Sequence, residues 1–194
     1  MSYYAQKKWI CFDEVAMDGV VTLLPEPFYS DVETIWADLQ LACNVRGILA
    51  TPVPHFSWHV AEGYDKEQLL KNLTQICAET RPFTIRTAGL GIFTGDIPVV
   101  YIPLVKNRTL MDFHDRVWSA ADGCAFGSRN YYGPEDWMPH ITLVFQDVCV
   151  ENIACIASRL FNHSFSWEME AQNLALIGQA PGMSGSVFFK LPFS

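Results

Sequence analysis

An internal repeat constrains the fold of this chain more than any other feature of its sequence. Each half contains, in the same order, a helical pattern, an alternating segment that begins with a histidine, a second helical pattern and two strand-like runs. The expected segments of the first half lie at 30–43, from 55, 65–77, 83–90 and 99–105. Those of the second half lie at 109–121, 140–145, 153–161, 165–177 and 187–191. One further strand is predicted at 9–12.

A repeat of this kind predicts two lobes related by a pseudo-two-fold axis. Strands covered on one side by helices make the expected fold class α+β, with a cleft between the lobes. At 194 residues the chain is expected to form a single domain, with a first lobe over about 1–105 and a second over about 106–194.

The two histidine segments have matching sequences, Pro54-His55-Phe56-Ser57 and Pro139-His140-Ile141-Thr142. Residues i and i+2 of a strand point to the same face. Each histidine is therefore expected to share a face with the hydroxyl residue that follows it, while Phe56 and Ile141 point into the packing. Equivalent strands would bring all four polar side chains to the same cleft.

Two histidines facing one site suit general acid–base chemistry. Histidine titrates near neutrality, so one ring is expected to accept a proton from a nucleophile while the other donates one to a leaving group. Neighbouring hydroxyls donate hydrogen bonds to an oxygen that gains negative charge. Displacement at phosphorus fits this set, with no metal or other cofactor required. The sequence leaves open which histidine is the base.

The paired motifs resemble those of the two-histidine (2H) phosphoesterase superfamily, which includes 2′,5′-RNA ligases and cyclic phosphodiesterases. Leu90-Gly91-Ile92-Phe93, with the strand that follows, is also similar to the stretch between the family's two motifs. The resemblance implies metal-independent action on phosphodiesters, often 2′,3′-cyclic phosphates opened to 2′-phosphates. It also implies acid–base roles for His55 and His140 and phosphate contacts for Ser57 and Thr142.

Four further residues are candidate substrate contacts. His59 is expected on the cleft face of its strand, and Phe93, Tyr132 and Trp137 lie in loops where an aromatic ring would be able to stack on a base. The spacing of His55 and His59 does not predict a metal pair, because that spacing works on a helix. We expect His114 and His163 to be structural, and Lys106 and Arg129 to be solvated surface residues more than phosphate ligands.

Composition limits the partners. The net charge is −8 and no basic stripe is present, so we expect a small nucleotide or an RNA end as substrate and no long nucleic acid. No apolar run is long enough to span a bilayer, and we expect a cytoplasmic monomer without membrane contact. The six cysteines show no Cys-x-x-Cys pair, so neither a zinc site nor a disulfide framework is predicted.

The sequence therefore predicts a metal-independent phosphodiesterase that hydrolyses a 2′,3′-cyclic phosphate or a 2′,5′-linked nucleotide. Two alternatives stay open. One is a nucleotide- or RNA-end-binding module with little catalysis, although binding alone does not require a paired acid and base. The other is an RNA 2′,5′-ligase, which runs the same chemistry in reverse.

Overall fold

The computed structural model describes residues 17–178 and 185–194, and the predicted strand at 9–12 lies outside them. The helices are α1 (Phe28–Cys43), α2 (Lys66–Ala78), α3 (Arg108–Asp122) and α4 (Ile153–Leu160), with short 3₁₀ turns η1 (Gly47–Ala50) and η2 (Asn130–Tyr132). The strands are β1 (Asp18–Leu23), β2 (His55–Ala61), β3 (Gly63–Tyr64), β4 (Phe83–Arg86), β5 (Gly91–Phe93), β6 (Val99–Pro103), β7 (Ala125–Phe126), β8 (His140–Phe145), β9 (Glu168–Ala171), β10 (Asn173–Gly178) and β11 (Ser186–Pro192).

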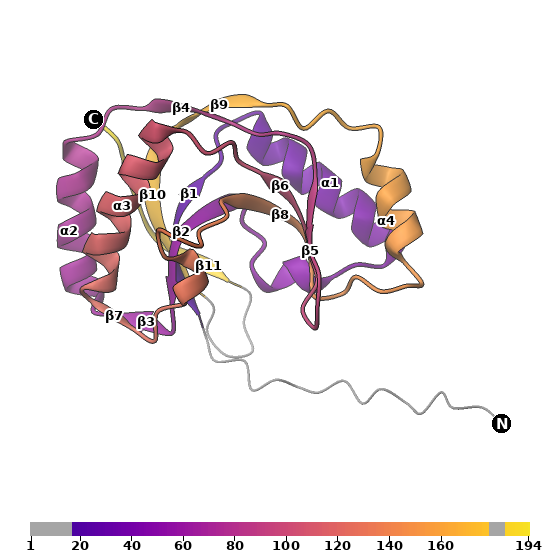
Figure 1. Ribbon diagram of the computed structural model, residues 1–194, viewed down its shortest axis with the longest axis horizontal. Helices are drawn as coiled ribbons and strands as arrows, with labels where there is room; N and C mark the ends of the chain where they lie inside the picture. The colour runs from indigo at the N-terminus through magenta and orange to yellow at the C-terminus, as the bar shows by residue number, and fades with distance from the viewer. Residues whose placement is uncertain (1–16, 179–184) are drawn as a thin grey trace.

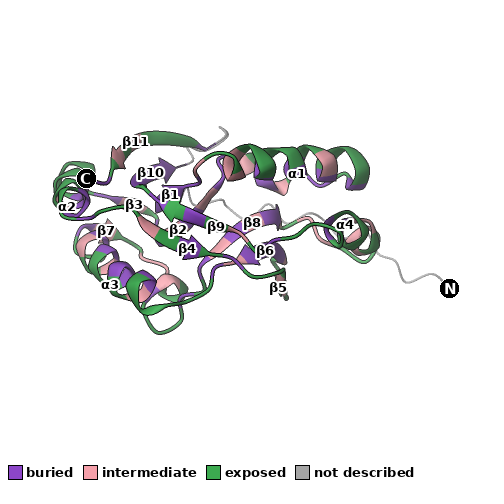
Figure 2. Cartoon of the chain, turned by 90° about the horizontal axis from the view of Figure 1, so that it is seen from above, coloured by how far each residue is buried: buried purple, intermediate pink, exposed green. Residues whose placement is uncertain are grey.

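A seven-stranded antiparallel sheet forms the centre of the molecule, in the order β11-β10-β1-β2-β8-β6-β5. Helices α2 and α3 pack together at one end of the sheet, and α1 packs on α4 at the other end (Figures 1 and 2). This confirms the α+β class. The helix pairs draw on both halves of the sequence, and the pseudo-two-fold axis stays a prediction.

The two histidine strands pair with their outer neighbours in the same way. In the β1–β2 ladder the register shifts beside Trp58, and in the β6–β8 ladder it shifts beside Leu143. In both strands the residue at the shift directly follows the hydroxyl residue of the motif. Such a bulge leaves one residue without a ladder partner and changes the direction of the side chains beyond it.

Apolar periodicity accounts for the helices that cover the sheet. In α3 the residues at helical spacing are buried, as a one-sided apolar stripe requires: Leu110, Phe113, Val117 and Ala121. Asp65 caps α2, where its carboxylate accepts a hydrogen bond from the Gln68 amide at 3.1 Å. These helices fix the outer face of the sheet and leave its motif face free to line a site.

Two predicted strands differ from those observed. The run at 165–177 is interrupted at Gln172, so that β9 pairs with β4 in a separate ribbon while β10 enters the main sheet. The run at 83–90 is a strand only to Arg86. A strand that changes sheets keeps its apolar pattern, and periodicity alone does not reveal the break.

The cysteine prediction needs a correction, because Cys43 and Cys155 form a disulfide with Cα atoms 5.7 Å apart. The two residues are 112 positions apart in sequence, and only the packing of α1 on α4 brings them together. Spacing along the chain gives no signal of such a pair.

In the part of the chain that the structure describes, no helix is both long and apolar enough to cross a bilayer.

Candidate active site

The strand register gathers the four motif side chains into one block. Phe56 of β2 pairs with Ile141 of β8 in antiparallel register. His55 therefore lies opposite Thr142, and Ser57 lies opposite His140, at the close spacing of directly opposed residues. All four are half-buried, whereas Phe56 and Ile141 are fully buried on the other face. A histidine thus has a hydroxyl residue as its neighbour both along its own strand and across the strand pair.

Both histidine rings are held by the same kind of hydrogen bond. The Nδ1 atom of His55 lies 2.5 Å from the Val53 carbonyl, and the Nδ1 atom of His140 lies 2.6 Å from the Met138 carbonyl. A carbonyl oxygen only accepts hydrogen bonds, so Nδ1 carries the proton in each ring. The free Nε2 of each neutral ring is then available to take a proton from a reacting group.

Burial lowers the pKa of both histidine rings. Burial lowers the pKa of His55 to about 4, opposed by its bond to Val53 and assisted by the charge of His140 nearby. Burial also lowers the pKa of His140, opposed by its bond to Met138. Both rings are therefore neutral at pH 7 without a bound anion.

A cavity of about 520 Å³ opens beside His140. This volume suits a ligand of nucleotide size. The residues that line it are Phe93, Ile97, Val99, Tyr131, Tyr132, Asp136, Met138, His140, Thr142 and Phe145. Most of them are apolar or aromatic, and none of these lining residues is Lys or Arg. The polar members of the lining are thus Asp136, His140, Thr142 and the two tyrosine hydroxyls.

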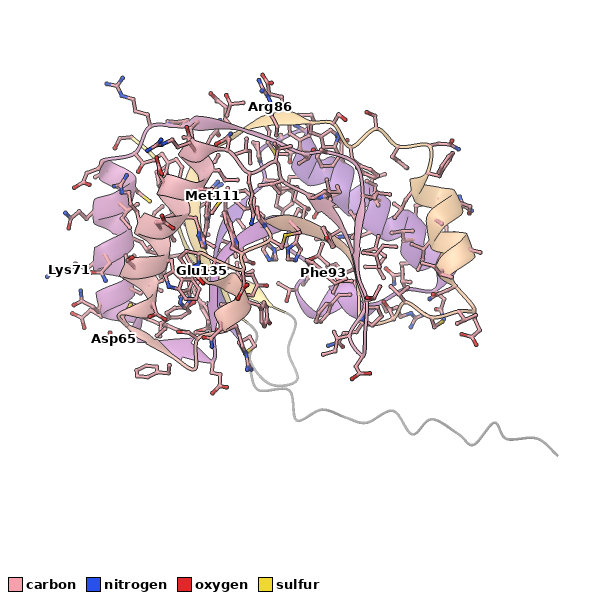
Figure 3. The ribbon with its side chains drawn as sticks, in the orientation of Figure 1. Asp65, Lys71, Arg86, Phe93, Met111 and Glu135 are labelled. Carbon is pink, nitrogen blue, oxygen red and sulfur yellow. A yellow bond between two sulfur atoms is a disulfide. The ribbon has the colours of Figure 1, made fainter. Side chains whose placement is uncertain are left out.

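Phe93 lies where the sequence predicted an aromatic contact. Its ring stacks on Tyr101 at 4.2 Å between centroids and meets the ring of His140 edge-on at 5.1 Å. Figure 3 shows Phe93 on the β5 side and Glu135 on the side of the loop that precedes β8. Phe93 and Asp136, the neighbour of Glu135, both line the cavity.

Tyr132 also lines the cavity, on the loop that precedes β8. Burial raises the pKa of its phenol, and the hydroxyl of Ser57 partly opposes that rise. Tyr132 therefore remains a neutral hydrogen-bonding group over the physiological range, next to the first motif. Its exposed neighbour Tyr131 contributes a second ring to the same wall.

Trp137 does not lie at the cavity surface, which corrects its prediction as a base contact. It is fully buried, and its ring stacks on His114 at 3.8 Å and on Trp58 at 5.3 Å. His114 is buried as well, and its Nε2 lies within hydrogen-bonding distance of the Trp58 and Tyr132 carbonyls. An aromatic residue in a loop before a strand either contacts a ligand or packs in the core, and only its packing in the fold distinguishes the two.

The prediction that His59 shares the face of His55 is wrong. The register shift at Trp58 turns His59 to the opposite face, where its ring packs on Trp118 at 4.3 Å. His59 is fully buried, and its Nδ1 lies 2.7 Å from the Tyr64 hydroxyl. The alternation of side chains between the two faces of a strand reverses beyond a bulge, and no local sequence pattern predicts the bulge at Trp58.

The two basic candidates lie away from the cavity lining. Arg129 forms an ion pair with Glu62 at 3.6 Å, and Lys106 is exposed.

Within residues 17–178 and 185–194, no group of three or more His, Cys, Asp or Glu side chains is arranged to hold a metal ion. Sequence reasoning missed several apolar residues of the wall, such as Met138 and Phe145, whose only signal is their place beside the second motif.

This fold and this site define a class, the two-histidine phosphoesterases. A family model described as "2'-5' RNA ligase superfamily" matches residues 25–182, and the chain belongs to that superfamily. A search of curated proteins finds no match to the chain.

Solved structures show the same fold at low sequence identity. The crystal structure of TT0787 from Thermus thermophilus has a TM-score of 0.62 and 16% identity, over 91% of this chain and 97% of that one. A structure titled "Crystal structure of phosphoesterase" has a TM-score of 0.57 and 14% identity, over 92% and 98% of the two chains. Kluyveromyces marxianus Usb1 gives 0.50 and 9%, over 92% and 98%.

Proposed function

We propose that this protein is a metal-independent phosphodiesterase that hydrolyses a 2′,3′-cyclic phosphate or a 2′,5′-linked nucleotide. The observation that carries the proposal is the block of His55, Ser57, His140 and Thr142, in which both rings keep Nε2 free on one face of the sheet. Membership of the superfamily supports the general class of reaction. The largely apolar cavity beside the block supports a substrate with a nucleoside part.

The unequal surroundings of the histidines favour a division of roles. His140 lines the cavity, where the nucleoside would bind, so its Nε2 is the one next to the departing ribose oxygen. His55 does not line the cavity and has the pKa of about 4, which suits a group that stays neutral. We therefore assign His55 as the general base and His140 as the general acid.

The reaction then proceeds in line at phosphorus. His55 Nε2 takes a proton from water as the water oxygen bonds to phosphorus, and the bond from phosphorus to the 3′-oxygen breaks. His140, protonated once the anionic substrate raises its pKa, gives its Nε2 proton to that oxygen. Ser57 and Thr142 donate hydrogen bonds to the phosphoryl oxygens. The products are a 2′-phosphate and a free 3′-hydroxyl, and solvent resets the two rings.

The nucleoside would lie in the aromatic cavity. Base stacking on Phe93 and Tyr132 is tolerant of sequence, and the absence of Lys and Arg from the cavity lining argues against a long phosphate chain. A short substrate with a single reacting phosphodiester fits this distribution of charge. The net charge of −8 points the same way.

Phosphorus NMR tests the proposal. 2′,3′-Cyclic nucleotides incubated with the protein in EDTA should give a 2′-phosphate signal, and the His140→Ala variant should not. Tight binding without turnover would identify a nucleotide-binding module. Formation of 2′,5′ junctions from RNA ends, without hydrolysis, would identify a ligase.

A further inference from the structure

Two buried tryptophans hydrogen-bond to the backbone of the motif strands from outside the sheet ladders. Trp36 of α1 donates its indole N–H to the Thr142 carbonyl at 3.1 Å. Trp137 donates its indole N–H to the Ser57 carbonyl at 3.0 Å. In both cases the acceptor is the carbonyl of the motif's hydroxyl residue. An indole N–H only donates, so each bond has a single possible sense.

The ladders are interrupted at these two carbonyls. The register shift in the β1–β2 pair follows Ser57, and the shift in the β6–β8 pair follows Thr142. Strands β2 and β8 pair through Phe56 and Ile141 alone. A carbonyl beside such an interruption needs a donor from elsewhere, because buried backbone groups are almost always paired. The two indoles supply that donor.

The two contacts also cross between the motifs. Trp36 precedes the first motif along the chain, yet it binds the second motif strand. Trp137 precedes the second motif, yet it binds the first motif strand. Thr142 of the second motif is thus held by α1, the helix that precedes the first motif, and Ser57 of the first motif is held by the loop that precedes the second motif. This arrangement fixes the two strands relative to one another where their own ladder is shortest.

We propose that Trp36 and Trp137 are positioning residues for the phosphodiesterase reaction, a role that rests on the function proposed above. Holding the carbonyl of Ser57 or Thr142 fixes the peptide plane directly after the residue whose hydroxyl faces the phosphate. Neither tryptophan is among the residues that line the cavity, so neither touches the substrate there. Their effect reaches the reaction through the direction of the two hydroxyls.

Trp36→Phe and Trp137→Phe keep an aromatic ring and remove the donor. Because the hydroxyls act on charge that develops in the transition state, kcat should fall about tenfold or more while KM stays within about twofold. Trp167→Phe is the matched control, because Trp167 lies before β9 and its ring packs on Phe28 and Phe165, at 5.2 and 5.7 Å between centroids. The control should keep kcat within about threefold of the wild type.

A second readout does not depend on activity. With ¹³C-labelled carbonyls, Trp137→Phe should shift the Ser57 signal and leave Thr142 unchanged, and Trp36→Phe should do the reverse. If a Phe variant does not fold, replacement of the same tryptophan by 3-benzothienylalanine removes the N–H while keeping the ring shape. The same two measurements apply to that protein.

The outcomes separate the two proposals. Carbonyl shifts with an unchanged kcat would overturn the positioning role, and so would an equal loss of kcat in Trp167→Phe. A wild-type protein without turnover on any cyclic nucleotide or 2′,5′-dinucleotide would instead overturn the proposed function. Loss of kcat confined to Trp36→Phe and Trp137→Phe, with the matched carbonyl shifts, supports both.

Discussion

The two motif strands, β2 and β8, are alike in backbone and unlike in surroundings. Each has a bulge after its hydroxyl residue, a histidine held through Nδ1 by a carbonyl two residues before it, and a buried apolar residue between. Only β8 adjoins the cavity, through His140 and Thr142. The comparison teaches that two strands with matching backbone geometry differ in what they face: the proposed acid His140 adjoins the cavity, and the proposed base His55 does not.

The largest effect should come from removing either histidine. His55→Ala and His140→Ala are each expected to lower turnover at least a hundredfold, because each removes one proton-transfer group. Steady-state kinetics on a cyclic nucleotide measure this loss. His163→Ala, which changes an exposed histidine, is the control and should retain normal turnover. Near-full activity in either motif variant would break the account.

The hydroxyl residues should matter less. Ser57→Ala and Thr142→Ala each remove one of several donors to the phosphate, so a loss of about tenfold to a hundredfold in kcat is expected. Similar losses in the two variants would show that the motifs are equivalent in this respect. A loss as large as that of the histidine variants would mean that one hydroxyl has a further role, for example as a nucleophile.

The cavity beside β8 should set substrate affinity. Phe93→Ala removes a ring that would stack on the base, and KM should rise about tenfold with little change in kcat. Phe126→Ala is the control, since Phe126 is exposed on β7 and outside the cavity lining. A fall in kcat with constant KM would place the nucleoside elsewhere.

The pH dependence of kcat/KM sharpens the difference between the strands. The free protein needs a neutral His55, whose pKa is about 4, and a protonated His140, whose pKa lies below its ordinary 6.5. The profile should therefore be bell-shaped, with both limbs below pH 6.5. The kcat profile should lie at higher pH, because the bound anion raises the pKa of both rings. A profile flat across this range would contradict the assignment.

The smallest effect concerns stability. His55 and His114 have pKa values lowered from 6.5 to about 4 by burial, so between these values the unfolded chain binds protons that the folded chain does not. Stability is complete above pH 6.5 and falls as the pH drops toward 4. Urea unfolding across this range measures the slope, and His114→Gln should reduce it. An unchanged slope in that variant would rule out His114 as a contributor.

The sequence predicted the parts of the site that depend on local pattern. Alternation placed His55 beside Ser57 and His140 beside Thr142, and the repeat order predicted the α+β class. It failed for His59, because a bulge reverses alternation without any signal in nearby residues. It also failed for Trp137, because an aromatic residue before a strand packs inward or outward according to its distant neighbours, here His114 and Trp58.

Long-range packing was the other part that the sequence did not reveal. The Cys43–Cys155 bond needs α1 against α4, a contact between opposite halves of the chain. The cavity walls likewise combine β5, β6 and the loop before β8. Periodicity describes each element separately and contains no information on which elements meet.

The most direct test of the unequal roles uses a substrate whose leaving group needs no proton. Methyl 4-nitrophenyl phosphate releases a stabilised phenolate, and its flat ring fits the apolar cavity beside His140. On this ester His140→Ala should recover most of the wild-type rate, while His55→Ala should remain at least a hundredfold slower. Recovery in His55→Ala instead would reverse the assignment, and equal loss in both variants would contradict the account of one base and one acid.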